Sequence, residues 1–306
     1  MTEDRTSSPT VNRLPGWDDL GAETRTEWES LISRISLPPM YKHSAGSTAD
    51  NFRPKELAAD IEADPVISGT IIAVANSAKI GLSSPIMTVD RAIVHLGFNL
   101  IVSIISSYQL QQALASGQGV SREFLDLIRR WSATARTATL HFFKRASMLD
   151  RHEEAPTVAL LARLGTVILA MSSNPPRSSY LTLPDEPARL QHELAEFSVT
   201  SPLLSGRLVR HWTLPEPIPS MVDNLWQPVL LELEPSETNR ALTLLALSVN
   251  LADTYMNYSR VTPEEFLGRN AYQTLAANLK RMELLEIVND AWESKLMQRE
   301  LEAASY

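Results

Sequence analysis

Cysteine is absent from this sequence, and glycine is scarce. Because none of the 306 residues is cysteine, the chain has no disulfide bond, thiolate nucleophile, iron–sulfur cluster or cysteine zinc site. Its 11 glycines fall well below the usual frequency of about 7%. This shortage disfavours turn-rich all-β folds and glycine-rich phosphate loops, so we expect an all-α fold.

Long apolar runs and an excess of basic residues are also missing. No run reaches about 18 apolar residues, and the polar start of the chain lacks the apolar centre of a signal peptide. We therefore expect a cytoplasmic protein with no membrane partner. The net charge of −8, from 28 basic and 36 acidic residues, has the wrong sign for a chain whose main partner is nucleic acid.

The helical spacing of apolar residues divides the chain into five parts. These are a flexible leader (1–15), a lead-in helix (16–36), a small N-terminal helical lobe (37–118), a larger helical lobe (119–260) and a C-terminal helical extension (261–306). The predicted breaks coincide with clusters of proline, glycine and serine.

Within these parts the pattern predicts individual helices. The larger lobe should contain a long helix from Ser121 to about Met148, a strongly apolar helix over 157–171, and helices near 185–197 and 201–212. We further expect Ser236 to cap an apolar helix that ends near residue 256, and Thr262-Pro263 to open another. The helix beyond about residue 270 carries an apolar stripe that should pack on the body of the protein or on a second copy, so a homodimer is left open. The stripe consists of Leu279, Met282, Leu285 and Val288.

Common catalytic motifs are missing. The six histidines are never three or four residues apart and no Glu-x-x-His occurs, so helix-borne metal sites lack their usual spacing. The Gly-x-Gly at residues 117–119 follows no predicted strand and reads as a loop. We expect no cofactor.

Several short stretches of the sequence nevertheless form a known order. In the N-terminal half they are Asp64-Pro65, Ala75-Asn76-Ser77-Ala78, Pro85-Ile86 and the run RAIVHLG over 91–97. In the C-terminal half they are Trp131, Leu164-Gly165, Val199-Thr200, Arg210-His211-Trp212 and Asn250-Leu251-Ala252-Asp253. Over residues 37–256 the chain resembles the HDOD domains, all-helical relatives of the HD phosphohydrolases that occur in bacterial signalling proteins and generally lack hydrolase activity.

The resemblance also implies where the metal ligands of the HD phosphohydrolases would fall. Those positions hold Ala133, Ala162, Arg163, Ser201, Leu225, Trp226 and Asp253. A catalytic metal needs about three protein ligands and an open coordination position, whereas one aspartate beside a permanent cation supplies neither. We therefore expect no metal and no enzyme activity, and we expect Arg163 to pair with Asp253 in the vacated site.

The function predicted on this basis is a non-catalytic bacterial signalling or regulatory scaffold that acts through protein–protein contacts. No effector domain fits in the remaining residues, so its partner would be another signalling protein. One alternative is a binding module for a small anionic ligand or nucleotide in the vacated site, with Arg163 as the phosphate fork. A second alternative is a residual metal-dependent phosphohydrolase.

One segment is basic within this acidic chain. Residues 101–151 contain seven basic and three acidic side chains, a net charge of +4. A solvated helix face explains such a run, but it also favours contact with an acidic partner or an anion. The candidate contact residues are Arg129, Arg130, Arg136 and Arg163.

Overall fold

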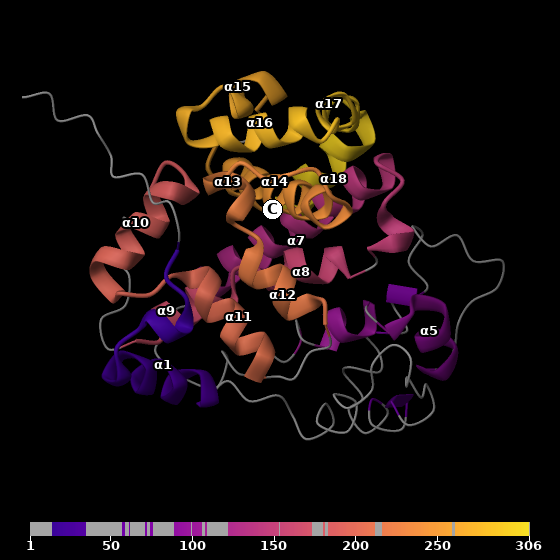
Figure 1. Ribbon diagram of the computed structural model, residues 1–306. Helices are drawn as coiled ribbons and strands as arrows, with labels where there is room; N and C mark the ends of the chain where they lie inside the picture. Colours follow the sequence, from indigo (N-terminus) through magenta and orange to yellow (C-terminus); the bar gives the residue numbers. More distant parts are fainter. Residues whose placement is uncertain are drawn as a thin grey trace, which may run out of the picture.

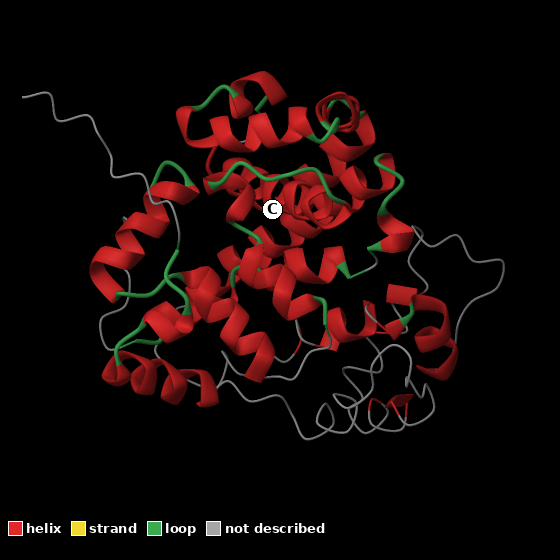
Figure 2. Ribbon diagram, in the orientation of Figure 1, coloured by secondary structure: helices red, strands yellow, loops and turns green. Residues whose placement is uncertain are grey.

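The computed structural model describes residues 14–34, 57–58, 61, 71, 74–75, 89–98, 100–105, 108, 122–152, 154–172, 180, 183–211, 216–258 and 261–305. All regular elements within these ranges are helices, as Figure 2 shows. The predicted all-α class is therefore confirmed.

Two long helices form the centre of the molecule. They are α7 (Arg122–Arg145) and α14 (Glu237–Tyr258), which pack against each other. On α7 the buried residues Trp131, Ala135, Ala138 and Phe142 recur every three or four positions, which gives one apolar stripe. The middle of α14 is buried on nearly all sides, because other helices surround it (Figure 1).

Shorter helices surround this pair. They are α1 (Ala22–Arg34), α5 (Val89–Leu96), α8 (Ala155–Leu161), α9 (Leu164–Ala170), α10 (Glu186–Phe197), α11 (Ser201–His211), α12 (Ile218–Asn224), α13 (Gln227–Leu230), α15 (Pro263–Leu267), α16 (Gln273–Arg281), α17 (Leu285–Trp292) and α18 (Lys295–Ser305). Single 3₁₀ turns lie at Trp17–Asp19, Leu149–Arg151 and Asn270–Tyr272. In Figure 1, α15, α16 and α17 cover one end of the molecule, and α1 lies at the opposite end beside α11.

The prediction of one apolar helix over 157–171 is wrong, because this stretch forms two helices. α8 ends at Leu161, α9 begins at Leu164, and Ala162 and Arg163 form the turn between them. The hydroxyl of Ser205, on α11, donates to the carbonyl of Ala162 at 2.9 Å and accepts the N–H of Gly165 at 2.7 Å. These bonds satisfy backbone groups at the break, so the turn is stable although the sequence reads as one helix.

Gly165 lets α9 and α11 approach closely. A Cβ atom at this position would lie 1.8 Å from the carbonyl oxygen of Ser201. Only glycine fits such a contact between backbones, and the contact holds the α8–α9 turn against the start of α11.

The stretch beyond residue 270 is also divided, into α16, α17 and α18 rather than one helix. The α16 helix ends where Glu283 adopts a left-handed φ of 57° and the Leu284 N–H bonds back to the Leu279 carbonyl at 2.8 Å. The expectation that this stretch packs on the body is confirmed, since α16 contacts α13 and α14, and α18 contacts α7. Leu279, Met282 and Val288 are buried, whereas Leu285 is partly buried.

Other predicted boundaries agree within a few residues. The long helix ends at Arg145 rather than near 148, and α14 begins at Glu237, where the Ser236 hydroxyl accepts the Asn239 N–H at 3.1 Å. Thr262 opens α15, as its sequence predicted, and the structure adds a capping box with Glu265. The lead-in helix is shorter than expected, because Trp17–Asp19 is a separate 3₁₀ turn and α1 begins at Ala22.

Some expectations concern residues outside the described ranges. These include the leader up to residue 13 and most of the proposed N-terminal lobe over 37–118. Of that lobe, α5 is described and ends before Gly97 as predicted, with a φ of 75° at the glycine. Among the described residues, no helix combines the length and the apolar character needed to cross a membrane.

Candidate functional site

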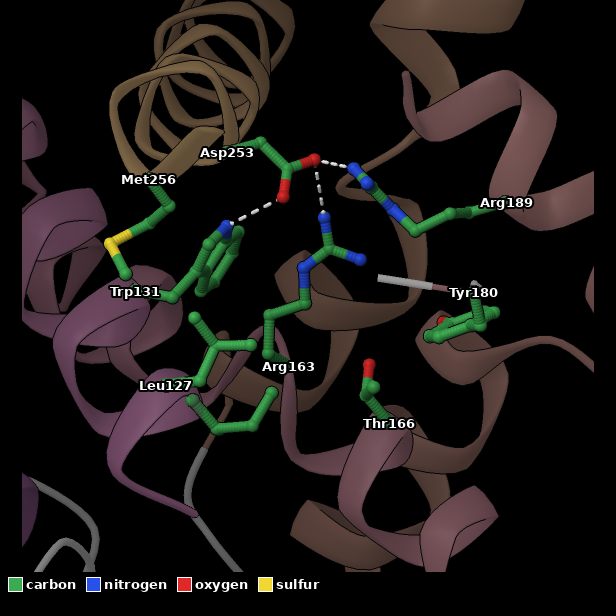
Figure 3. A pocket seen from close by; sticks show the side chains of 9 residues that line it. Leu127, Trp131, Arg163, Thr166, Tyr180, Arg189, Asp253 and Met256 are labelled. Carbon is green, nitrogen blue, oxygen red and sulfur yellow. Dashed lines mark hydrogen bonds and ion pairs between the residues drawn. The ribbon is translucent and has the colours of Figure 1, made fainter. Parts of the chain in front are cut away.

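Four charged side chains meet at the centre of the larger lobe. They are Arg163 from the α8–α9 turn, Glu186 and Arg189 from α10, and Asp253 from α14, and we call them the ionic cluster. Figure 3 shows Arg163 and Arg189 approaching the Asp253 carboxylate from two directions. Ion pairs thus link segments that lie far apart in the sequence.

The arginines form a continuous set of bonds with the two carboxylates. Arg163 uses both of its terminal nitrogens on Glu186, with Nη1 3.0 Å from Oε1, and its Nη2 also lies 3.0 Å from Oδ2 of Asp253. Arg189 donates from Nε to Oε2 of Glu186 at 2.9 Å and forms an ion pair with Asp253. Two positive and two negative groups therefore balance, which is the condition under which buried charges are tolerated.

Two tryptophans enclose the Arg163 guanidinium. Its Cζ atom lies 4.5 Å from the ring centroid of Trp131 and 5.3 Å from that of Trp226, within the range of cation–π attraction. The Trp131 indole N–H also donates to Oδ1 of Asp253 at 3.0 Å. Trp131 therefore contacts both Asp253 and Arg163 and helps to fix their relative positions.

The electrostatics of the cluster favour the charged forms of Glu186 and Arg163. Burial alone would raise the pKa of Glu186, but Arg163 and Arg189 more than offset this and hold it below the usual range. Burial would likewise lower the pKa of Arg163, and Glu186 raises it instead. A fixed guanidinium charge thus occupies the centre of the lobe.

A second acidic group of α10, Glu193, lies two turns beyond Glu186. The buried Glu193 accepts the Tyr180 hydroxyl and, at 2.6 Å from Oε2, the backbone N–H of Ser201. Burial, together with the negative charge of Glu186, raises the pKa of Glu193 to about 7. Glu193 therefore changes its protonation state near neutral pH, and its carboxyl group accepts a hydrogen bond from the first residue of α11.

The local sequence explains why α10 carries these groups inward. Asp185 caps the helix by accepting the Ala188 N–H at 2.9 Å, and a proline stands in the first turn. The buried residues of α10 are Glu186, Arg189, Leu190 and Glu193, at positions i, i+3, i+4 and i+7. This is the spacing of a core-facing stripe, yet three of the four side chains are charged.

Sequence reasoning missed Glu186, Arg189, Tyr180 and Glu193. One feature of the sequence could have indicated them. The apolar residues of α10 form a narrow stripe, so the helix can pack against the core only if charged residues are part of its buried face. Arg163, the partner of Glu186, was predicted at the vacated site, and its expected pairing with Asp253 is confirmed at 3.0 Å.

The other positions that the HDOD resemblance assigned to metal ligands lie on helices and turns of the larger lobe. Ala133 is partly buried on α7, Ala162 is buried in the α8–α9 turn, and Ser201 is the buried first residue of α11. Leu225 and Trp226 are buried in the turn between α12 and α13. Of these five, Trp226 contacts the cluster directly, through Arg163.

The structure describes the side chains of three of the four arginines that were predicted as anion or partner contacts. Arg163 belongs to the ionic cluster, and Arg130 donates to the Ser305 carbonyl of α18 at 3.4 Å. Arg136 is partly buried on α7, where burial lowers its pKa. It follows Arg130 by six residues, so at about 100° per residue the two point about 120° apart around the helix. The side chain of Arg129 lies outside the described residues.

The cluster leaves little room beside it and offers a poor donor set for a metal ion. The adjoining cavity, which Trp131, Arg163, Tyr180 and Asp253 line, has a volume of about 30 Å³, enough for one or two water molecules. Both carboxylates are engaged by arginines, whose charge opposes a divalent cation. Within the described ranges no three His, Asp or Glu side chains gather as metal ligands would. The residues present therefore do not fit the metal centre of the HD phosphohydrolases.

Solved structures share this fold. An HDOD domain protein of unknown function from Geobacter sulfurreducens aligns with a TM-score of 0.59 and 20% identity, covering 93% of this chain and 99% of its own. A protein from Shewanella amazonensis SB2B, named as a candidate phosphohydrolase, aligns with a TM-score of 0.58 and 18% identity over 90% of this chain and 98% of its own. A second from that organism, named as a candidate metal-dependent phosphohydrolase, has a TM-score of 0.52 and 17% identity over 94% and 100%.

Sequence comparison assigns the family. No curated protein matches the chain. The model of the HDOD domain matches residues 36–228, which contain the α8–α9 turn, all of α10 and α11, and both tryptophans around Arg163. This match covers well over half of the sequence and agrees with the shared fold, so the chain belongs to the HDOD domain family.

Proposed function

We propose that this chain is a non-catalytic regulatory scaffold that acts through contacts with another protein. The ionic cluster carries this proposal. At the position where the related hydrolases would hold a metal, a guanidinium pairs with two carboxylates, and the surrounding side chains leave space for little more than water. With this position filled by ion pairs, we infer that the protein acts through its helical surface.

The two alternatives fit these contacts less well. A phosphate bound by Arg163 would have to displace Glu186 and Asp253 from a buried position, leaving two carboxylates without one of their partners. A residual hydrolase would need a metal held beside two arginines, which repel it. The hydrolase names of the two Shewanella amazonensis proteins belong to those proteins, and their low identity supports the fold alone.

The test measures turnover and partner capture on the same purified full-length chain. Hydrolysis of bis(p-nitrophenyl) phosphate and of cyclic dinucleotides is assayed with added manganese, zinc and iron. Tagged chain is then used to capture proteins from a lysate of the source bacterium. The comparison variant Arg163→Met/Asp253→Asn alters the cluster while Glu186 and Arg189 still balance each other.

A scaffold predicts no turnover above the buffer rate and capture of one defined partner by both the native chain and the folded double variant. Metal-dependent turnover by the native chain that the double variant lacks would overturn the proposal. Failure of both forms to retain any partner would count against the protein–protein part.

A further inference from the structure

A larger cavity lies away from the ionic cluster, where the segment before α1 covers α11, α12 and α13. Its volume is about 350 Å³, which falls within the range of about 300–1,000 Å³ typical of small-molecule sites. Leu14 and Trp17 form one wall, and residues of the α11–α13 region form the others. We call it the α11–α13 cavity.

Two fully buried side chains in its lining carry a polar atom that has no partner in the described part of the chain. They are Thr200, with its hydroxyl oxygen, and Trp226, with its indole nitrogen. Thr200 directly precedes α11, a position where threonine usually caps a helix. Here the first N–H of α11, that of Ser201, bonds to Glu193. The Thr200 hydroxyl is left without a bond, although an unpaired buried group is costly.

These two groups define what a ligand must offer. An indole N–H only donates, and a hydroxyl can donate as well as accept. An acceptor oxygen is therefore the kind of ligand atom that suits either group. The aromatic face of Trp226 is already taken, since Arg163 lies over it, so the cavity can engage the indole without disturbing the cluster.

The remaining lining adds charge and apolar surface. Its charged residues are Arg207, Arg210 and Asp223, an excess of one positive charge. Arg210 is paired with Asp223. Arg207 lies over the Trp17 ring at 4.3 Å from the centroid and only 3.5 Å from the carboxylate of the exposed Glu29, a loose contact that an anion can replace. Apolar surface comes from Pro202, Leu203, Leu230 and Leu231.

We propose that the α11–α13 cavity is a binding site for a compact organic anion with an apolar body. The anionic oxygens accept from the Thr200 hydroxyl and the Trp226 N–H and face the Arg207 guanidinium. The apolar body lies against Pro202 and the leucines of α11 and α13. This inference does not depend on the scaffold proposal, because it uses none of the groups of the ionic cluster.

The experiment compares matched carboxylates and amides on the full chain. Phenylacetate and indoleacetate are titrated to about 10 mM against phenylacetamide and indoleacetamide, with the melting temperature and isothermal calorimetry as readouts. The carboxylates should raise the melting temperature in a saturable way. The neutral amides, which have the same shape, should bind at least about tenfold more weakly because they lack the charge.

Three variants locate the site. Thr200→Val keeps the side-chain shape and removes the hydroxyl, and Arg207→Gln removes the positive charge of Arg207, so each should weaken carboxylate binding about tenfold. Arg281→Gln, on α16 and outside the cavity lining, is the matched control and should bind as the native chain does. Unfolding midpoints without ligand confirm that each variant is folded.

The outcomes divide cleanly. Equal binding by native chain, Thr200→Val and Arg207→Gln would place the ligand elsewhere and overturn the proposal. Absence of binding by both carboxylates would also overturn it and would mean that the cavity holds water only. Equal binding of acid and amide would remove the requirement for an anion and overturn the proposed ligand class.

Discussion

The ionic cluster and the α11–α13 cavity share Trp226 but differ in how their buried polar groups are satisfied. In the cluster, Arg163 bonds to two carboxylates, and Trp131 bonds to Asp253, one of them. In the cavity, a hydroxyl and an indole N–H have no partner in the described chain. The cluster has the balance expected of a structural element, whereas the cavity has the incompleteness expected of a binding site.

Substitution of one side chain in each region tests this comparison. Side chains in the cluster should be costly to remove, because each leaves an opposite charge unpaired. Side chains that carry the unpaired groups of the cavity should cost little stability and should affect ligand binding instead.

The largest effect is expected for Arg163. Arg163→Met should lower the free energy of unfolding by about 3–5 kcal/mol, because Glu186 and Asp253 then share only Arg189. The double variant Arg163→Met/Asp253→Asn restores the balance of charge and should lose much less. Urea denaturation of both variants measures the difference. Equal losses would mean that charge balance does not govern the cluster.

The next effect concerns Glu193 and pH. Its pKa is about 7 in the folded chain against an ordinary value of 4.5, so between these values the folded state binds the proton more tightly than the unfolded state. The contribution of Glu193 to stability should therefore fall as pH rises from about 4.5 to about 7, by at most about 3 kcal/mol.

Glu193→Gln imitates the protonated side chain and should remove this part of the pH dependence. The exposed Glu196→Gln on the same helix is the control and should follow the native profile. Chemical denaturation at several pH values provides the measurement. A Glu193→Gln profile parallel to that of the native chain would show that Glu193 does not titrate in this window.

How much of this could be predicted differs between the two regions. The fold class and the Arg163–Asp253 pair followed from the sequence, because helical spacing is local and the HDOD resemblance places the two residues together. Glu186 and Arg189 were missed because charged residues three apart on a helix usually face solvent. The break between α8 and α9 was missed because its hydrogen bonds come from Ser205, about 40 residues later.

The α11–α13 cavity was not predictable from the sequence at all. A hydroxyl before a helix is read as a cap, and Thr200 fits that pattern by position. Such a cap accepts the N–H of the second or third helical residue, and the second residue of α11 is Pro202, which has no N–H. An unsatisfied group is a property of the assembled neighbours and has no local signature.

A smaller effect is expected where α9 packs against α11. Gly165→Ala would force its Cβ against the Ser201 backbone and should destabilise the fold by about 1–3 kcal/mol. Gly21→Ala is the matched control, since nothing lies within 4 Å of a Cβ there. Thermal unfolding compares them. Similar midpoints would show that α9 and α11 can move apart without loss.

The smallest effect, and the one that sharpens the comparison most, is expected for Thr200→Val. If the hydroxyl is unpaired, replacing it with a methyl group of the same shape removes a buried polar group and should raise the free energy of unfolding by about 1 kcal/mol.

Thr139→Val provides the contrast. The Thr139 side chain is equally buried, but its hydroxyl donates to the Ala135 carbonyl at 2.9 Å, so its loss should lower stability by about 1 kcal/mol. Urea denaturation of both variants gives opposite signs if the cavity is incomplete without a ligand. A loss of stability in Thr200→Val equal to that in Thr139→Val would show that the Thr200 hydroxyl is already satisfied, and the distinction between the two regions would fail.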